Sequence, residues 1–214
     1  MNKVYTIGYS AFKIENFIEI LKQYGIKCLI DVRSVPRSKH FQDFNSENLE
    51  RFLKQHKILY RNYAEEFGAR QTDKKFFTDG VLDFEKFSKS QQFLAGIRKI
   101  EKGMDMGFTF TLMCAEKRPE ICHRCILVGR QFYKRGYEVR NILDDGNYIK
   151  QDEVEKILVN EYFPRKCQLS LFERDDICLS IDEKIHQSYV KRGKEIGYRL
   201  EKNFDEEDFH DWFH

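Results

Sequence analysis

The stretch Leu112-Met-Cys-Ala-Glu-Lys-Arg-Pro-Glu-Ile-Cys-His-Arg-Cys125 decides the fold prediction for this chain of 214 residues. The apolar run that leads into it, residues 108–113, has the length and β-rich composition of a buried strand. Pro119 follows a charged loop, and the periodic segment 121–133 is typical of a helix whose first turn holds Cys122-His-Arg124. A strand, a short loop and a helix N-terminus can hold an anion or a reactive thiol. We therefore expect the functional centre here.

Outward from this stretch, short β-rich segments alternate with amphipathic segments. The expected strands and helices alternate at residues 4–7, 12–24, 28–32, 46–55, 58–60, 83–101, 108–113, 121–133 and 137–143. This alternation predicts βαβ units, and hence an α/β fold with a mostly parallel sheet and helices on both faces, as in Rossmann or flavodoxin-like domains. We expect this domain to span residues 1–163, and a C-terminal helical and extended arm to span residues 164–214.

Three polar segments follow expected strands: Thr6-Ile-Gly-Tyr-Ser10, Asp31-Val-Arg-Ser-Val-Pro-Arg-Ser38 and Met113-Cys-Ala-Glu-Lys-Arg-Pro-Glu-Ile-Cys-His-Arg124. Ligands of parallel sheets bind beyond the carboxyl ends of the strands, so these segments are expected to share one crevice. They resemble the three motifs of the domain-of-unknown-function 488 family, and the resemblance covers residues 3–143. It implies a compact α/β domain in which these residues cluster. Many members have two glycines where this chain has Gly68-Ala69.

The residues of the crevice favour an enzyme that binds an anion. The expected catalytic residues are Asp31, Cys114, Glu116 and Cys122. The expected anion-binding residues are Ser10, Arg33, Ser34, Arg37, His123 and Arg124. Carboxylates supply acid–base chemistry, a thiol at a helix N-terminus can act as a nucleophile, and arginines bind phosphate through paired hydrogen bonds. The alternatives are that Asp31 only caps a turn and that the arginines are ordinary surface residues.

Three interpretations are open for Cys114 and Cys122. They are buried apolar thiols, a redox or nucleophilic pair, or metal ligands together with His123, Glu116 and Asp31. The Cys-x7-Cys-His spacing matches no structural zinc pattern, and adjacent residues on a helix rarely bind one ion, so no metal ligand is assigned. The cofactor is left unknown.

Composition favours a folded cytoplasmic protein. The chain is 41% hydrophobic and has 19 Phe against 3 Pro, which favours a folded globular protein over a disordered one. The six cysteines are scattered, the N-terminal residues lack the apolar core of a secretion signal, and no segment is apolar enough to span a membrane. Residues 201–214 carry six acidic residues and one lysine, so residues 1–200 have a net charge of +7. A basic body permits a nucleic-acid partner.

The second informative stretch is Gln168-Leu-Ser-Leu-Phe172. It is similar to the pentapeptide Gln-Leu-Ser/Asp-Leu-Phe by which bacterial repair and replication proteins dock on the sliding clamp. The residues expected to bind the clamp are Gln168, Leu169, Leu171 and Phe172, with the apolar side chains entering a pocket. The alternative is a short edge strand packed on the domain. Residues 181–200 predict a basic helix that could contact DNA, and residues 201–214 an acidic, aromatic tail.

Together these features predict a bacterial DNA-repair or DNA-processing protein, an enzyme with a phosphate or nucleotide pocket that is recruited to the sliding clamp. Its partners would be DNA or a nucleotide, and the clamp, with no membrane. A non-catalytic thiol-redox or metal-binding sensor is the alternative. A small-molecule enzyme that uses the same pocket, with a chance clamp motif, is a third interpretation.

Overall fold

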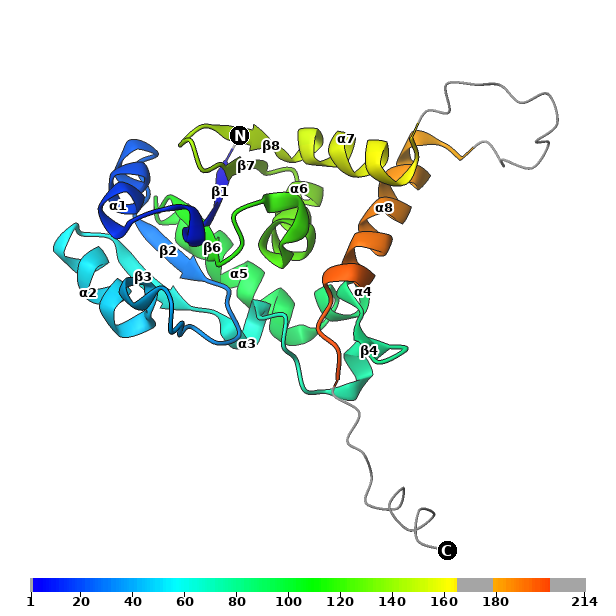
Figure 1. Cartoon of the computed structure of the whole chain (residues 1–214), viewed down its shortest axis with the longest axis horizontal. Helices are drawn as coiled ribbons and strands as arrows, with labels where there is room; N and C mark the ends of the chain where they lie inside the picture. The colour runs from blue at the N-terminus through cyan, green and yellow to red at the C-terminus, as the bar shows by residue number, and fades with distance from the viewer. Residues whose placement is uncertain (1, 165–178, 201–214) are drawn as a thin grey trace, which may run out of the picture.

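A six-stranded sheet lies at the centre of the computed structural model, which describes residues 2–164 and 179–200 (Figure 1). Its strands, in spatial order, are β3 (Leu59–Asn62), β2 (Cys28–Asp31), β6 (Phe110–Cys114), β1 (Lys3–Gly8), β7 (Glu138–Ile142) and β8 (Tyr148–Lys150). All neighbours are parallel except β7 and β8, so the mostly parallel sheet is confirmed. β8 was not among the expected strands. It forms because the turn at residues 144–146, with Gly146 at a φ of +82°, sends the chain back along β7.

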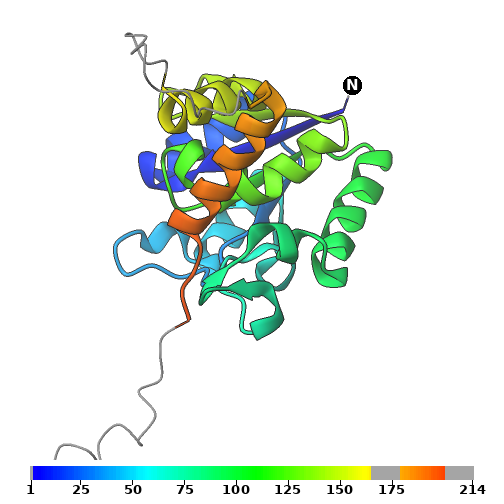
Figure 2. The same ribbon diagram turned by 90° about the vertical axis from the view of Figure 1, so that its right-hand side faces the viewer.

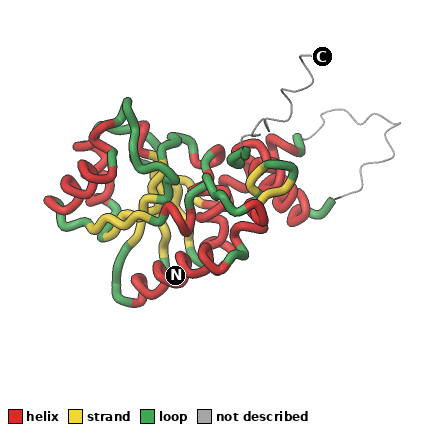
Figure 3. The backbone as a smooth tube through the Cα atoms, turned by 90° about the horizontal axis from the view of Figure 1, so that it is seen from below, coloured by secondary structure: helices red, strands yellow, loops and turns green. Residues whose placement is uncertain are grey.

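Helices cover both faces of the sheet because successive strand residues point to opposite sides. On β1, Ile7 joins the core beneath α1 (Ile14–Gln23) and α2 (Ser46–Gln55). Val4, three residues earlier on the same strand, belongs to the core on the other face, which α5 (Gln91–Asp105) and the helices after β6 cover. Figure 3 shows the strands with helices on either side.

The segment expected to be one helix at residues 83–101 is two, α4 (Phe84–Ser88) and α5. The break has a local cause, since the Ser90 hydroxyl accepts a hydrogen bond from the Phe93 amide and caps a new helix. The irregular segment before it includes short elements: α3 (Ala64–Phe67), the 3₁₀ turn η3 (Lys74–Phe76), and a hairpin of β4 (Phe77–Thr78) and β5 (Val81–Leu82). Two further 3₁₀ turns are η1 (Tyr9–Ala11) and η2 (Gln42–Phe44).

The segment after β6 is not the regular helix that its periodicity predicts. It consists of a 3₁₀ turn η4 (Pro119–Ile121), a π-helix η5 (Arg124–Gly129) and a short α6 (Arg130–Lys134). Pro119 opens the first turn, where its fixed φ and missing amide hydrogen are tolerated. Cys122 consequently lies between two helical segments rather than within the first turn of one. Single π-helical turns occur frequently at functional sites.

The C-terminal helix α8 (Ile181–Ile196) lies against α7 (Gln151–Tyr162) and reaches the β4–β5 hairpin (Figure 2). Tyr189 of α8 is buried in the sheet core, where its hydroxyl accepts a hydrogen bond from Gln151. Arg192 forms an ion pair with Glu161. The basic helix expected beyond residue 163 therefore packs on the α/β body. Within the described ranges, no helix has the length and apolar character needed to cross a membrane.

Candidate functional site

A pocket of about 490 Å³ opens at the carboxyl ends of β2, β6 and β1, which are neighbours in the sheet. The connections after β1 and β2 cover one face, whereas those after β3 and β6 cover the other, and such a change of face leaves a crevice. Residues of all three polar segments line it: Tyr9, Arg33, Ser34, Arg37, Ser38, Cys114, Ala115, Glu116 and His123. The segments that follow these three strands therefore share one pocket.

Close packing on β1 and a buried arginine hold the loop that follows β6. A Cβ atom on Gly8 would lie 1.9 Å from the carbonyl oxygen of Glu116, so the loop can pack there only because residue 8 is glycine. The backbone amide of Ser10 donates to the carbonyl of Ala115 at 3.1 Å. Nη1 of Arg124 donates to the same Glu116 carbonyl at 2.5 Å, and Nη2 donates to the Lys117 carbonyl at 3.2 Å. The loop is thus fixed at two consecutive peptide groups.

Neither Ser10 nor Arg124 occupies the position expected for an anion ligand. Arg124 is fully buried, and its guanidinium faces the loop carbonyls instead of the pocket. The expectation assumed a regular helix beginning near residue 121, whereas the π-helix places Arg124 beneath the loop. Both residues therefore shape the site from behind it.

Four side chains with reactive or metal-binding groups gather at the base of the pocket: Cys114, Glu116, Cys122 and His123. Their candidate ligand atoms all lie within 4.8 Å of one another. The Cys122 sulfur is 2.8 Å from Oε2 of Glu116, and the Cys114 sulfur is 3.7 Å from Nδ1 of His123. Cys114, Glu116 and His123 line the pocket, and Cys122 lies behind them. We call these four residues the thiol cluster.

The two thiols of the cluster titrate in opposite directions. Burial alone opposes a thiolate at Cys122, but the hydrogen bond from Cys114 and the positive charges of Arg124 and His123 outweigh it and hold the pKa of Cys122 well below its usual value. The same hydrogen bond, together with burial, raises the pKa of Cys114. Cys122 is consequently the more acidic thiol of the pair.

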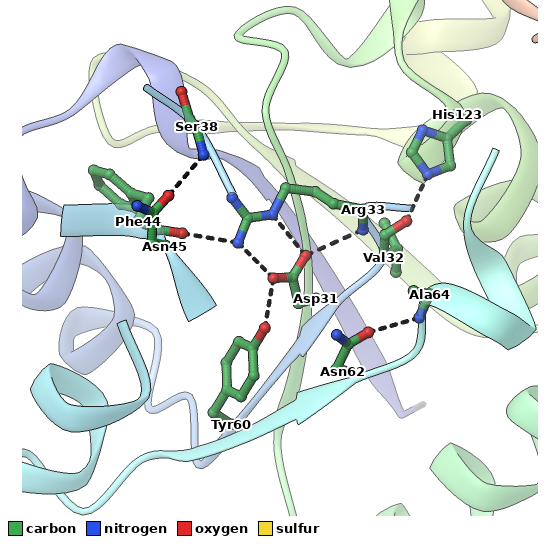
Figure 4. Close-up of polar contacts among 10 residues, drawn as sticks. All are labelled: Asp31, Val32, Arg33, Ser38, Phe44, Asn45, Tyr60, Asn62, Ala64 and His123. Carbon is green, nitrogen blue, oxygen red and sulfur yellow. Dashed lines mark hydrogen bonds and ion pairs between the residues drawn. The ribbon is translucent and has the colours of Figure 1, made fainter. Parts of the chain in front are cut away.

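The imidazole and the carboxylate of the cluster are also coupled to Cys122. Burial disfavours the charged imidazole, yet the hydrogen bond and negative charge of Cys122 raise the pKa of His123. Burial and the charge of Cys122 raise the pKa of Glu116. Nε2 of His123 lies 2.9 Å from the Val32 carbonyl, which can only accept, so this nitrogen carries a proton (Figure 4). Nδ1 faces the Cys114 sulfur.

Asp31, expected as a catalytic residue, lies on the opposite face of the sheet from the thiol cluster. Its carboxylate is fully buried and accepts hydrogen bonds from Nε (2.8 Å) and Nη2 (2.6 Å) of Arg33 and from the Tyr60 hydroxyl (2.7 Å) (Figure 4). Nη2 of Arg33 also donates to the Phe44 carbonyl. Asp31 does not line the pocket, whereas its partner Arg33 does.

The rim of the pocket carries the exposed side chains Arg37 and Arg70. The Ser34 hydroxyl accepts a hydrogen bond from the Arg70 amide at 2.7 Å, which joins the segment before residue 70 to the loop after β2. A Cβ on Gly68 would lie 2.8 Å from that hydroxyl oxygen, whereas Ala69 accommodates its side chain at the pocket wall. One glycine is therefore sufficient here.

Sequence reasoning assigned no role to Tyr9 or Ser38, and it left open whether Arg70 is a surface arginine or part of an anion clamp. All three residues line the pocket. Tyr9 and Ser38 belong to the quoted motifs and could have been found there. Arg70 lies in an irregular segment far from any strand end, so the rule that located the other residues could not find it. The expected clamp-binding residues Gln168, Leu169, Leu171 and Phe172 lie outside the described residues.

Comparison with known proteins gives one match. A family model described as Domain of unknown function DUF488 matches residues 13–130, more than half of the chain. The matched region runs from the start of α1 to the end of the π-helix and includes the thiol cluster. No curated protein and no solved structure matches the chain.

Proposed function

The chain belongs to the family described as Domain of unknown function DUF488, and from this premise we propose that it is a DNA-processing or DNA-repair enzyme of the bacterial cytoplasm that binds a phosphate-bearing nucleotide unit in its pocket. One observation carries the proposal: a polar pocket lined by Arg33, Arg37 and Arg70 opens directly above the thiol cluster. Arginine binds phosphate through paired hydrogen bonds. Within residues 1–200, basic residues outnumber acidic ones, which favours binding of a polyanion such as DNA.

The cluster supplies the chemical groups for a reaction at the bound phosphate or sugar. Glu116 and His123 are the acid–base residues in this proposal, because both face the pocket with perturbed pKa values. A nucleophile needs both a low pKa and access to the substrate. Cys122 has the first property and Cys114 the second, so neither thiol has both, and the proposal depends on the acid–base pair of Glu116 and His123.

Fluorescence anisotropy with a labelled oligonucleotide, single- or double-stranded, tests the binding step. Arg70→Met should weaken binding by about 3–10-fold and reduce the slope of log affinity against log salt by about one, because one phosphate contact is lost. Arg98→Met is the matched control, since Arg98 is an exposed arginine of α5 that does not line the pocket. Equal binding by the two variants, and by wild type, would contradict a nucleic-acid pocket at this position.

Recruitment to the sliding clamp through residues 168–172 is the second part of the proposal. A short linear peptide buries little surface, so its affinity alone should be about micromolar, near −8 kcal/mol. Calorimetry with the purified clamp should show heat for the wild type, and the double variant Leu171→Ala, Phe172→Ala should lose it. Ser170→Ala is the control, because the motif accepts either Ser or Asp at this place. Heat that is identical for all three proteins would refute recruitment by this motif.

A thiol-redox sensor is the second candidate, favoured by the two cluster sulfurs lying within 4.8 Å of each other. A peroxide would accept two electrons as the two thiols lose their protons and join in a disulfide, with water as the product. Mass spectrometry after peroxide treatment should then find Cys114 linked to Cys122, and reductant should restore both thiols. Absence of this link under conditions that oxidise a control dithiol would exclude the sensor.

A further inference from the structure

We infer that Cys114, Glu116, Cys122 and His123 bind one divalent transition-metal ion of the zinc class. The inference goes beyond the proposed function, since it depends on these four side chains and not on the identity of the substrate. Two sulfur atoms, one imidazole nitrogen and one carboxylate oxygen form the donor set. Soft sulfur and nitrogen donors select zinc, iron(II) or cobalt(II) over magnesium and calcium, which prefer oxygen alone.

The distances within the cluster suit a single small ion. Bonds of about 2.3 Å to sulfur and about 2.0–2.1 Å to nitrogen or oxygen place tetrahedral ligand atoms about 3.5 Å apart. The Cys114 sulfur and Nδ1 of His123 are already 3.7 Å apart, and the Cys122 sulfur and Glu116 Oε2 are 2.8 Å apart. No pair of ligand atoms is separated by more than 4.8 Å. Side-chain rotations that move the ligand atoms by about 1 Å would bring the set to tetrahedral spacing.

The backbone explains how adjacent residues can bind the same ion. Cys122 has an extended conformation, with φ −125° and ψ 136°, and His123 is the first residue with helical angles, φ −60° and ψ −26°. On a regular helix the two side chains would diverge by about 100°. Because the chain changes conformation between them, both face Cys114. Cys122 and His123, although adjacent in the sequence, can therefore bind one metal ion.

Residues around the cluster hold the ligands as they do in metal sites. The Nε2–H of His123 donates to the Val32 carbonyl at 2.9 Å, which directs the Nδ1 lone pair into the cluster. Histidine ligands in metal sites almost always donate their second ring N–H in this way. Gly8 and Arg124 fix the peptide of Glu116, so the fourth ligand is also held. The ligands thus have their orientation before an ion arrives.

The charges of the cluster supply a further argument. Two buried thiols and the carboxylate of an exposed residue, Glu116, are three potential anions within 4.8 Å of one another. In the absence of a metal ion, a proton must lie between the Cys122 sulfur and Oε2 of Glu116, which are 2.8 Å apart. A divalent ion replaces that proton and removes the repulsion. Since three of the four ligands line the pocket, the ion would also be reachable from it.

Elemental analysis and cobalt(II) reconstitution of the full-length reduced protein test the inference. Wild type should hold one equivalent of metal per chain, and the cobalt form should show visible d–d bands with a thiolate-to-cobalt charge-transfer band. Cys122→Ser and His123→Ala should each lower the affinity for cobalt(II) by more than about 100-fold. This exceeds the roughly 10–100-fold loss that follows when a residue hydrogen-bonded to a metal ligand is replaced. Cys125→Ser, three residues from Cys122 in the buried core, should keep the metal and both spectral features.

Failure of the variants to fold would not obscure the result, because chelator titration of wild type measures the same site. Removal of the ion should expose Cys114 and Cys122 to a thiol reagent and leave Cys125 protected. Wild type without stoichiometric metal after reconstitution, or variants that bind cobalt as tightly as wild type, would overturn the inference. Oligonucleotide binding by the chelated protein separates the two proposals, since the arginine rim remains when the ion is gone.

Discussion

Two buried polar groups lie at neighbouring strand ends and differ in almost every property. Asp31 of β2 pairs in register with Met113 of β6, so these two side chains point to the same face of the sheet. Cys114 is the next residue on β6, and because side chains alternate along a strand it points to the opposite face. The Asp31 carboxylate is saturated by Arg33 and Tyr60. The thiol cluster instead gathers groups that compete for protons. A polar group with matched partners stabilises a fold, whereas a group with competing partners is available for chemistry.

Replacement of Asp31 by Ala should have the largest effect on stability. The Arg33 guanidinium would remain buried without its carboxylate, and loss of one partner of such a pair costs about 3–5 kcal/mol. Urea unfolding should show this loss. Lys99→Ala is the control, because its ion pair with Glu66 is more than half exposed at Lys99 and should contribute less than about 1 kcal/mol. Similar losses in the two variants would mean that the Asp31–Arg33 pair is not the stabilising element we describe.

Tyr60→Phe should have a smaller effect with a distinctive pH dependence. The lost hydrogen bond goes to a charged carboxylate, so the free energy of unfolding should fall by about 1.5–3 kcal/mol. Tyr24→Phe should lower it by only about 0.5–1.5 kcal/mol, because the Tyr24 hydroxyl donates to a neutral carbonyl. Burial, and then the charge of Asp31, raise the pKa of Tyr60 above its ordinary value near 10. The folded protein therefore keeps a proton that the unfolded chain loses as the pH rises past 10.

The consequence for stability follows from that difference in bound protons. Above pH 10, the free energy of unfolding of wild type should fall by about 1.4 kcal/mol more per pH unit than that of Tyr60→Phe. Only wild type has a hydroxyl at residue 60 that loses its proton when the chain unfolds. Unfolding curves at pH 8, 10 and 11 measure the difference. Parallel declines of the two proteins above pH 10 would show that Tyr60 does not keep its proton.

The sequence predicted the sheet and the meeting of three strand ends, because both follow from periodicity and from the geometry of parallel βαβ units. It could not place Asp31 and Cys114 on different faces, since that depends on the register of β2 against β6. Nor could it show the π-helix, whose apolar spacing resembles that of an α-helix over one turn. The assignments of Arg124 as an anion ligand and of Cys122-His123 as poor metal ligands both depended on a regular helix.

Gly8→Ala should perturb the thiol cluster with a moderate loss of stability. The new methyl group would lie 1.9 Å from the Glu116 carbonyl oxygen, so the loop must move, at about 1–3 kcal/mol. Gly25→Ala is the control, because residue 25 has a φ of +62° with no atom within 4 Å, and its cost of about 1 kcal/mol comes from the backbone alone. Only Gly8→Ala should alter cobalt spectra and oligonucleotide binding. Unchanged site properties in that variant would show that the Glu116 loop is not held by packing on β1.

The smallest effect is expected at the rim, where Glu47 of α2 forms an exposed ion pair with Arg37. Such pairs contribute less than about 1 kcal/mol, so Glu47→Gln should leave the free energy of unfolding within about 0.5 kcal/mol of wild type. Released from its partner, Arg37 should bind a phosphate group more strongly, and we expect oligonucleotide affinity to rise about twofold at low salt. Glu50→Gln removes the same charge three residues further along the exposed side of α2 and corrects for the change in net charge. The gain should exceed that of Glu50→Gln in dilute buffer and disappear at high salt, where both charges are screened. Equal gains in the two variants would mean that net charge, and not the release of Arg37 into the pocket, governs binding at this rim.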